Sequence, residues 1–176
     1  MNKTLPFVRS ALCAAVIAVC AWLTVPSVVP FTMQTFAVFL TLWVLGGGYG
    51  TLAIAVYLLL GAVGVPVFAG FKGGIGALLG TTGGYLIGFL VTGGIYALAQ
   101  KLFGTRLWVR IAALVIGLLA CYAFGTAWFC IVYARTNGAI GVGTALSWCV
   151  LPFLLPDAAK LALAVFVGSR LEKIIK

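Results

Sequence analysis

Long apolar runs, separated by short stretches rich in glycine, proline or basic residues, dominate this chain of 176 residues. A helix that crosses the hydrocarbon core of a bilayer needs about 20 mostly apolar residues, and fewer where neighbouring protein shelters it. The pattern therefore predicts six transmembrane helices, with an apolar stretch broken by proline at 144–155 ahead of the last one. The six helices are expected at residues 7–25, 34–45, 49–63, 81–100, 107–133 and 157–171.

Glycine and proline mark the breaks between these helices. Pro26 and Pro30 end the first predicted helix, and the three glycines at 46–48 allow a tight connection between the second and the third. A glycine-rich segment at 64–80 separates the third from the fourth. Pro156 is expected to begin the sixth helix, because it has no amide hydrogen that would need a partner there.

The composition places the chain in a membrane. Hydrophobic residues make up 64% of the sequence and charged residues 7%, with a mean hydropathy of +1.25, whereas about 25% of the residues of a soluble domain are charged. We therefore expect an all-α integral membrane protein that forms one domain over residues 1–176. No clear A-x-A cleavage site precedes Pro26, so the first apolar run is interpreted as a membrane helix rather than a signal peptide.

Basic residues set the orientation, since cytoplasmic loops carry an excess of Lys and Arg. With the N-terminus in the cytoplasm, the outer loops hold only Lys72 and Arg135, and eight bases lie on the cytoplasmic side. Both termini are therefore expected in the cytoplasm, and the net charge of +9 requires no nucleic-acid partner. The eight bases are Lys3, Arg9, Lys101, Arg106, Arg110, Arg170, Lys173 and Lys176.

One of the only two acids of the chain, Asp157, is embedded in apolar sequence. A charge at the centre of a membrane helix costs about 2.5–3.5 kcal/mol, so it is usually paired and functional. Asp157 is expected in the first turn of the sixth helix, where an anion is favourable, and Lys160 follows on the same helix face. A structural ion pair, a proton relay and ligand recognition all fit this pair. Its place in the outer half of the helix favours ligand recognition.

Catalysis and metal binding lack the residues that they need. The chain has no histidine, and its other acid, Glu172, lies near the basic C-terminal end, which leaves too few groups for acid–base or metal chemistry. We therefore expect no enzyme activity, no catalytic residue, no metal and no cofactor. Five cysteines in apolar surroundings are expected to be buried free thiols. They are Cys13, Cys20, Cys121, Cys130 and Cys149.

Polar and irregular sequence gathers on the outer side, in the loops at 30–35 and 65–74. Because non-helical backbone at membrane depth is tolerated only inside protein or beside a cavity, we predict an outward-opening pocket for a small molecule. Thr82 lies where the fourth helix begins, so free amides there favour an anion. Three amphipathic aromatic residues either anchor the membrane interface or form a stacking wall: Tyr85, Tyr122 and Trp128.

Small residues recur every four positions on the first helix. Ala11 and Ala15 form one such pair, and Ala14 and Ala18 form another. Small residues let a neighbouring helix approach closely. Two interpretations stay open, namely packing within the chain and docking against a partner protein.

Several stretches, in this order and over most of the chain, resemble the BioY family, the biotin-specific S components of energy-coupling factor (ECF) transporters. The family often has proline where this chain has Thr81, and bases are scarce in the outer half, where only Lys72, Arg135 and Lys160 are available for a carboxylate. The stretches are VPFTMQT at 29–35, YLLLGAVGVPVFAG at 57–70, GTTGGYLIGF at 80–89, Tyr122 with Gly125 and Trp128, and PF at 152–153 followed by PDAAK at 156–160.

The resemblance implies an ECF S-component fold of six helices, with both termini cytoplasmic, in a bacterial plasma membrane. It also implies high-affinity capture of biotin from outside and its delivery inward with a transmembrane coupling protein and two ABC-type ATPases. The chain has no G-x-x-x-x-G-K-[ST] motif of its own to bind ATP. The small-residue face of the first helix, which carries Ala11, Ala14, Ala15 and Ala18, would dock against the coupling protein.

For the site, the resemblance implies eight substrate-binding residues. Asp157 would accept hydrogen bonds from the ureido N–H groups of biotin, and Lys160 would donate to a carbonyl or carboxylate. Gln34 is expected to close over the ligand as a lid, and Thr82 lies at the same outer end. Apolar and aromatic walls are expected from Phe31, Phe68, Tyr85 and Trp128.

Two alternatives stay open. The chain could be the S component for another vitamin, such as thiamin or riboflavin, which would then copurify with it. It could also be a structural subunit of a membrane complex without a transport role, which predicts no small-molecule binding and tolerance of Asp157→Ala.

Overall fold

The computed structural model describes residues 4–175, so Lys3 and Lys176 lie outside the described residues. Five helices in this part of the chain are long and apolar enough to cross a membrane. The first four are α1 (Leu5–Trp22), α2 (Gln34–Ala62), α4 (Gly83–Phe103) and α5 (Leu107–Asn137), and the fifth is an apolar stretch made of α6 (Val142–Cys149) and α7 (Leu151–Ile175).

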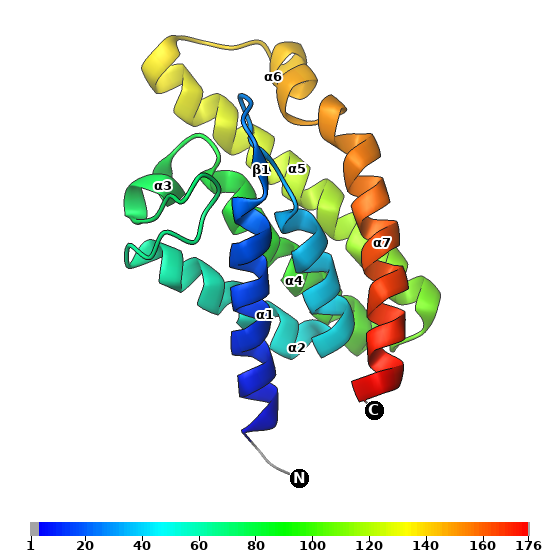
Figure 1. Cartoon of the computed structure of the whole chain (residues 1–176). Coiled ribbons are helices and arrows are strands. Elements are labelled where there is room, and N and C mark those ends of the chain that lie inside the picture. Colours follow the sequence, from blue (N-terminus) through cyan, green and yellow to red (C-terminus); the bar gives the residue numbers. More distant parts are fainter. Residues whose placement is uncertain (1–3, 176) are drawn as a thin grey trace.

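Helix α2 is two membrane crossings joined by a sharp bend. The backbone of Gly46 leaves the helical conformation, with φ +74° and ψ 176°, a region that glycine adopts readily. Oε1 of Gln100 on α4 accepts a 2.7 Å hydrogen bond from the N–H of Gly47. The arms 34–45 and 47–62 diverge from this point (Figure 1). The predicted number of six crossings, with a glycine break between the second and the third, is therefore confirmed.

The first helix is shorter than predicted. Helix α1 ends at Trp22, and the next residues form a small antiparallel hairpin of β1 (Thr24–Val25) and β2 (Phe31–Thr32). Thr24 pairs with Thr32 and Val25 with Phe31. The β-branched residues Thr24 and Val25 fit a strand well, and their backbone groups bond to the returning chain. Another short helix, α3 (Ile75–Leu79), lies in the glycine-rich segment after α2.

The last helix begins earlier than predicted. Helix α7 starts at Leu151 and contains Pro156 in its interior, so the prediction that Pro156 begins the helix with Asp157 in the first turn is wrong. The N–H groups of Phe153 and Leu154 both donate to the carbonyl of Val150, and this starts the helix before the proline. Pro156 removes one hydrogen bond from the helix ladder. The negative charge of Asp157 is consequently stabilised by side-chain partners and not by a helix N-terminus.

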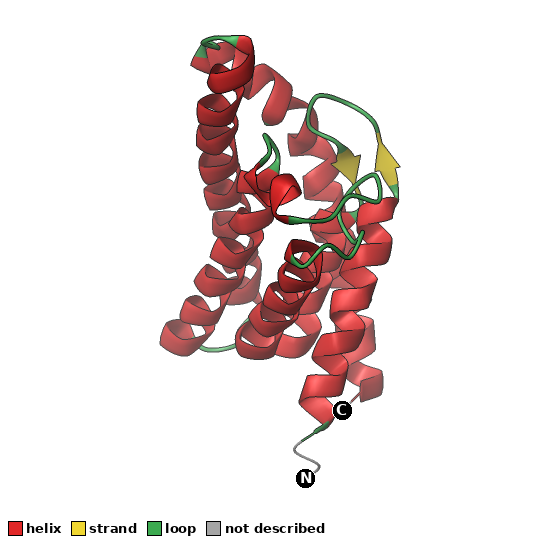
Figure 2. Cartoon of the chain, turned by 90° about the vertical axis from the view of Figure 1, so that its left-hand side faces the viewer, coloured by secondary structure: helices red, strands yellow, loops and turns green. Residues whose placement is uncertain are grey.

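The helices form one bundle whose described ends lie together. Figures 1 and 2 show both ends of the chain at the bottom of the bundle and the β hairpin at the opposite end. We call these the inner and the outer end. The inner end also carries the α4–α5 connection with Lys101 and Arg106. The charge pattern therefore assigns the inner end to the cytoplasm.

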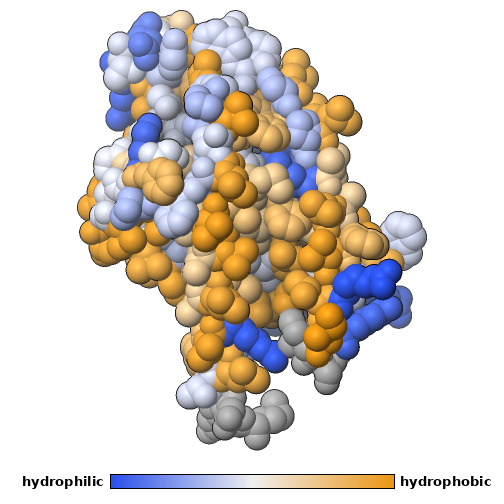
Figure 3. Space-filling model, in the orientation of Figure 1, coloured by the Kyte–Doolittle hydropathy of each residue, from blue (hydrophilic) through white to orange (hydrophobic). Residues whose placement is uncertain are grey.

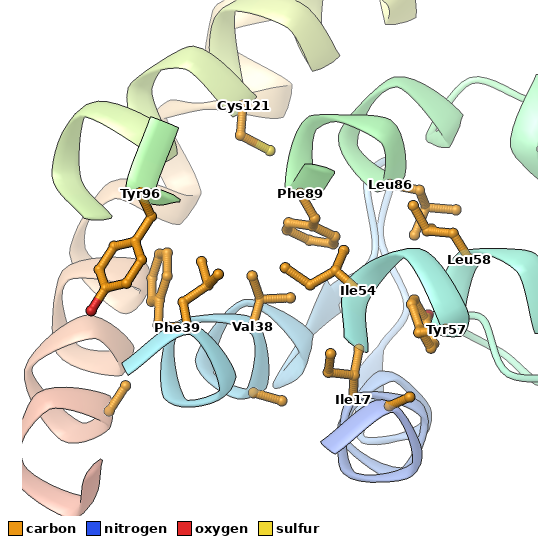
Figure 4. Packing of buried hydrophobic residues seen from close by; sticks show 14 of the residues in the cluster. Ile17, Val38, Phe39, Ile54, Tyr57, Leu58, Leu86, Phe89, Tyr96 and Cys121 are labelled. Carbon is orange, nitrogen blue, oxygen red and sulfur yellow. The ribbon is translucent and has the colours of Figure 1, made fainter. Parts of the chain in front are cut away.

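The core lies where α1, both arms of α2 and α4 meet. Figure 4 shows Ile17, Val38, Ile54 and Phe89 pointing toward one another, and all four side chains are buried. The outside is equally apolar: large hydrophobic side chains such as Leu12, Leu119 and Phe166 are exposed, and apolar residues cover much of the molecular surface in Figure 3. A surface of this kind suits lipid tails, and the protein is a multi-pass membrane protein.

Candidate functional site

A cavity of about 640 Å³ opens at the outer end of the bundle. Its wall is built from the turn of the β hairpin, the loop after α2, the start of α4, the middle of α5 and the start of α7. Five of the eight predicted substrate-binding residues line it, and they come from segments far apart in the sequence. They are Gln34, Phe68, Thr82, Tyr85 and Asp157.

Asp157 lies in the cavity wall with a donor on each carboxylate oxygen. Its Oδ1 is 2.8 Å from Nζ of Lys160, and its Oδ2 accepts a 2.6 Å hydrogen bond from the hydroxyl of Tyr122. Asp157 is 2% exposed and Lys160 is 5% exposed. Burial of a single charge would be costly, and the ion pair offsets that cost. Each carboxylate oxygen keeps a lone pair that can accept a further N–H from a ligand.

Lys160 stands behind Asp157 and does not line the cavity. Its ammonium lies 4.0 Å from the ring centroid of Phe31, a cation–π contact that stabilises a desolvated lysine. Phe31 in turn stacks on Phe153 with 5.9 Å between ring centroids, and Phe153 is the residue that faces the cavity. Direct ligand contact was expected from Lys160 and Phe31, but both form a supporting layer behind Asp157 and Phe153.

Tyr85 on α4 lines the cavity, and its ring packs against α5. Its hydroxyl is 2.9 Å from Oγ1 of Thr126. A Cβ atom on Gly125 would lie 2.3 Å from the tyrosine ring, so only glycine lets this ring lie flat against the helix. Thr82 lines the cavity one turn earlier, at the start of α4.

Trp128 supports the start of α4 from outside the cavity. Its Nε1 donates a 3.0 Å hydrogen bond to the carbonyl of Gly80, and a Cβ on Gly84 would come within 2.3 Å of its side chain. Trp128 is half-buried and is not among the lining residues. The prediction that it walls the cavity is therefore wrong, because its ring is occupied in joining α5 to α4.

Gln34 and Phe68 form a fixed part of the wall. Nε2 of Gln34 donates a 2.9 Å hydrogen bond to the hydroxyl of Tyr57, which donates to the carbonyl of Val67 at 3.2 Å. The ring of Phe68 packs edge-on against Tyr57 and directly over Gly61, where a Cβ would lie 1.9 Å from the ring. Gln34 is 4% exposed. It therefore ties the loop after α2 to the bundle, and this differs from the mobile lid that was expected.

Several wall residues were not among the eight predicted substrate-binding residues, although Tyr122 was a candidate for a stacking wall and Lys72 a base available for a carboxylate. Tyr122 is the most important, since it bonds to Asp157. Its position one helical turn before Thr126, beside Gly125, was an available signal for a polar face of α5 that points inward. Lys72, in the loop after α2, is the one base among the described residues that lines the cavity. Further lining residues that were not predicted include Phe153, Leu118 and Cys121.

The four alanines of α1 divide into two faces. Ala14 and Ala18 are 2% and 6% exposed and belong to the apolar core, so the prediction that they dock against a partner is wrong. Ala11 and Ala15 are exposed on the other side of the helix. Four-residue spacing therefore identified both pairs of small residues, but only one pair is accessible.

No cluster of three or more metal-ligating side chains occurs within residues 4–175. The cavity thus combines one buried carboxylate, one base, hydroxyl groups and apolar walls. Such a set can hold a small molecule that has both N–H donors and apolar parts.

Comparison with known proteins identifies the family. The family model described as the BioY family matches residues 1–176. This chain belongs to the BioY family. The BioY resemblance seen in the sequence is therefore confirmed, and the family places the chain among transport proteins, not enzymes.

Relatives within the BioY family cover most of the chain. A biotin transporter BioY of Thermotoga maritima is 41% identical over 168 residues, which are 95% of this chain and 95% of the relative. A probable biotin transporter BioY of Pyrococcus horikoshii is 42% identical over 144 residues, 82% of this chain and 81% of the relative.

A solved structure shares the BioY fold. It is the crystal structure of the S-component for biotin from an ECF-type ABC transporter, with a TM-score of 0.84 and 28% sequence identity. The match covers 98% of this chain and 94% of the other. The predicted fold, a membrane S component of six crossings, is thus confirmed.

Proposed function

We propose that this protein is a biotin-binding S component that takes up biotin in its outer cavity and delivers it inward with an ECF module. The observation that carries this proposal is the Asp157 carboxylate, buried in the wall of a cavity of about 640 Å³. Relatives named as biotin transporters support the identity of the ligand.

The cavity matches the chemistry of biotin in three parts. The ureido N–H groups donate to Asp157, whose charge is balanced by Lys160. Hydrogen bonds of a charged acceptor in a dry site are about twice as strong as neutral ones, and this supports high affinity. The thiophane ring and the aliphatic tail pack on apolar walls that include Leu86, Phe89 and Phe153.

Lys72 is proposed to bind the carboxylate at the end of the biotin tail. Three bases of the outer half were available from the sequence, and their positions favour Lys72. Lys160 is engaged by Asp157 behind the wall, and Arg135 is exposed outside the cavity. Lys72, in the loop after α2, lines the cavity.

The proposed partners are an ECF transmembrane coupling protein and two ABC-type ATPases. Uptake against a gradient needs an energy source, and the sequence has no ATP-binding motif. A solved structure of similar fold is the S-component for biotin from an ECF-type ABC transporter. On α1, Ala11 and Ala15 offer an exposed strip of small residues that lets a partner helix approach closely.

The test is equilibrium binding of biotin, thiamin and riboflavin to the purified protein by titration calorimetry. We expect biotin alone to bind. Binding of thiamin or riboflavin in place of biotin would assign the chain to another vitamin, and no binding of any of the three would favour a structural subunit. Uptake of labelled biotin by cells that express the chain with and without an ECF module then tests the partners.

A further inference from the structure

A second cavity of about 550 Å³ lies between α5 and α7 in the inner half of the bundle. Its wall is apolar along most of its length, with Leu107 and Ile111 from α5 and Leu161, Val165 and Phe166 from α7. Following α7 toward its C-terminal end, the wall becomes polar at Ser169, Arg170 and Lys173. The groove therefore runs from the apolar interior of the membrane to its cytoplasmic surface.

The charge at the inner end of this groove is unbalanced. Glu172 is the one acid of the inner end among residues 4–175, and it is already held by Arg110 through two hydrogen bonds of 2.9 Å and 3.1 Å. Arg170 and Lys173 are exposed, and the described residues place no carboxylate within salt-bridge distance of either. Two positive charges therefore stand at the cytoplasmic end of an apolar groove.

We propose that this groove binds one anionic phospholipid of the cytoplasmic leaflet. An acyl chain would lie along Ile111, Leu161 and Val165, and the phosphate would be bound by Arg170 and Lys173. Basic pockets between membrane helices on the cytoplasmic side favour anionic headgroups, and an apolar groove that faces the bilayer holds lipid tails and excludes water.

The same charges argue against a second copy of the chain in this groove. A two-fold axis through it would bring Arg170 and Lys173 of both copies together, and like charges at an interface oppose association. An anionic lipid supplies both the missing apolar surface and the missing negative charge. This site is separate from the outer cavity and does not depend on the proposed ligand of that cavity.

Native mass spectrometry of the detergent-purified protein tests the proposal, with phosphatidylglycerol, phosphatidylcholine of the same acyl chains, and glycerol phosphate as probes. We expect phosphatidylglycerol to bind one molecule per chain, and the other two probes to bind weakly. Arg170→Gln and Lys173→Gln should each weaken binding about fivefold. Ala162→Phe, which fills the groove from an exposed position, should block the lipid without a change of charge.

Lys101→Gln is the matched control, because it removes a base of the inner end that does not line the groove. Equal binding of the two phospholipids, binding of glycerol phosphate as tight as that of phosphatidylglycerol, or unchanged binding in Ala162→Phe would overturn the proposal. A dimer that the lipid does not displace would assign the groove to a second copy instead.

Discussion

The hydroxyl of Tyr122 on α5 donates a 2.6 Å hydrogen bond to the carboxylate of Asp157 on α7. At the inner end, Arg110 on α5 forms a two-point salt bridge with Glu172 on α7. Both acids of the chain therefore connect the same two helices, one beside the outer cavity and one near the cytoplasm. The apolar groove lies along the inner half of the same two helices, with lining residues on both sides of Arg110 in the sequence.

Asp157→Asn is expected to weaken biotin binding more than about tenfold, which corresponds to about 1.4 kcal/mol. Asparagine keeps the size of the side chain but loses the charge that strengthens the hydrogen bonds to the ureido ring. Titration calorimetry measures the loss. Arg135→Gln, an exposed outer position, is the control and should bind as the native protein does.

The single variant also leaves Lys160 buried without a counter-charge, which is itself destabilising. The double variant with Asp157→Asn and Lys160→Gln removes that problem. It should recover thermal stability but not biotin binding. Native affinity in either variant would contradict the assignment of Asp157 as a ligand-binding residue.

Tyr122→Phe is expected to lower stability by about 1.5–3 kcal/mol, because a hydrogen bond to a charged group is lost inside the protein. The same change should weaken biotin binding, since Asp157 is no longer held in place. Thermal unfolding in detergent measures the first effect. Tyr49→Phe, at a tyrosine that is 43% exposed, should leave the unfolding temperature unchanged, and an equal drop in both variants would argue against a special role of Tyr122.

Two adjacent glycines should respond in opposite ways to alanine. A Cβ on Gly47 would lie 2.3 Å from the backbone of Ala97 on α4, whereas a Cβ on Gly48 would meet nothing within 4 Å. Gly47→Ala should therefore cost about 1–3 kcal/mol through overpacking. Gly48→Ala should be neutral or stabilising by up to about 1 kcal/mol. Thermal unfolding of both variants decides this, and similar values would mean that α2 and α4 do not touch as closely as described.

Gly125→Ala should reduce biotin binding through Tyr85. The added methyl group would overlap the tyrosine ring, which must turn away from α5 and into the cavity. Calorimetry should show weaker binding, with Gly94→Ala as a control because a Cβ there meets nothing within 4 Å. An unchanged affinity in Gly125→Ala would indicate that the orientation of Tyr85 has no part in binding.

Arg110→Lys should destabilise the inner end even though the charge is kept. The guanidinium bonds to Tyr96 and Glu172 and lies 3.8 Å from the ring centroid of Trp43. Lysine cannot reproduce this planar, forked contact, so a lower unfolding temperature is expected. Arg106→Lys, at an exposed position before α5, is the control. Equal stability of the two variants would show that only the charge matters.

The number of membrane crossings could be predicted from the sequence because each one needs a long apolar run. A break at Gly46 could also be predicted, because Gly46 begins a run of three glycines. Hydropathy alone could not show that Thr24 and Val25 leave the helix, because both residues are compatible with an apolar helix and only pairing with Phe31 and Thr32 makes them a strand.

The site was predictable where residues are chemically rare. Asp157 drew attention because a carboxylate in an apolar helix is unusual. Which side of a helix points inward depends on packing between distant segments, and this is why Lys160, Phe31 and Trp128 proved to lie behind the wall. The Arg110–Glu172 pair spans 62 positions of sequence, so no local pattern could have revealed it.

Both described ends of the chain lie at the inner end, and the cavity opens at the outer end. A fluorescent protein or affinity tag fused to either end is therefore expected on the cytoplasmic side, at the end of the bundle opposite the mouth of the cavity. Tagged protein can thus report on transport in living cells while the route of the ligand into the cavity remains unobstructed.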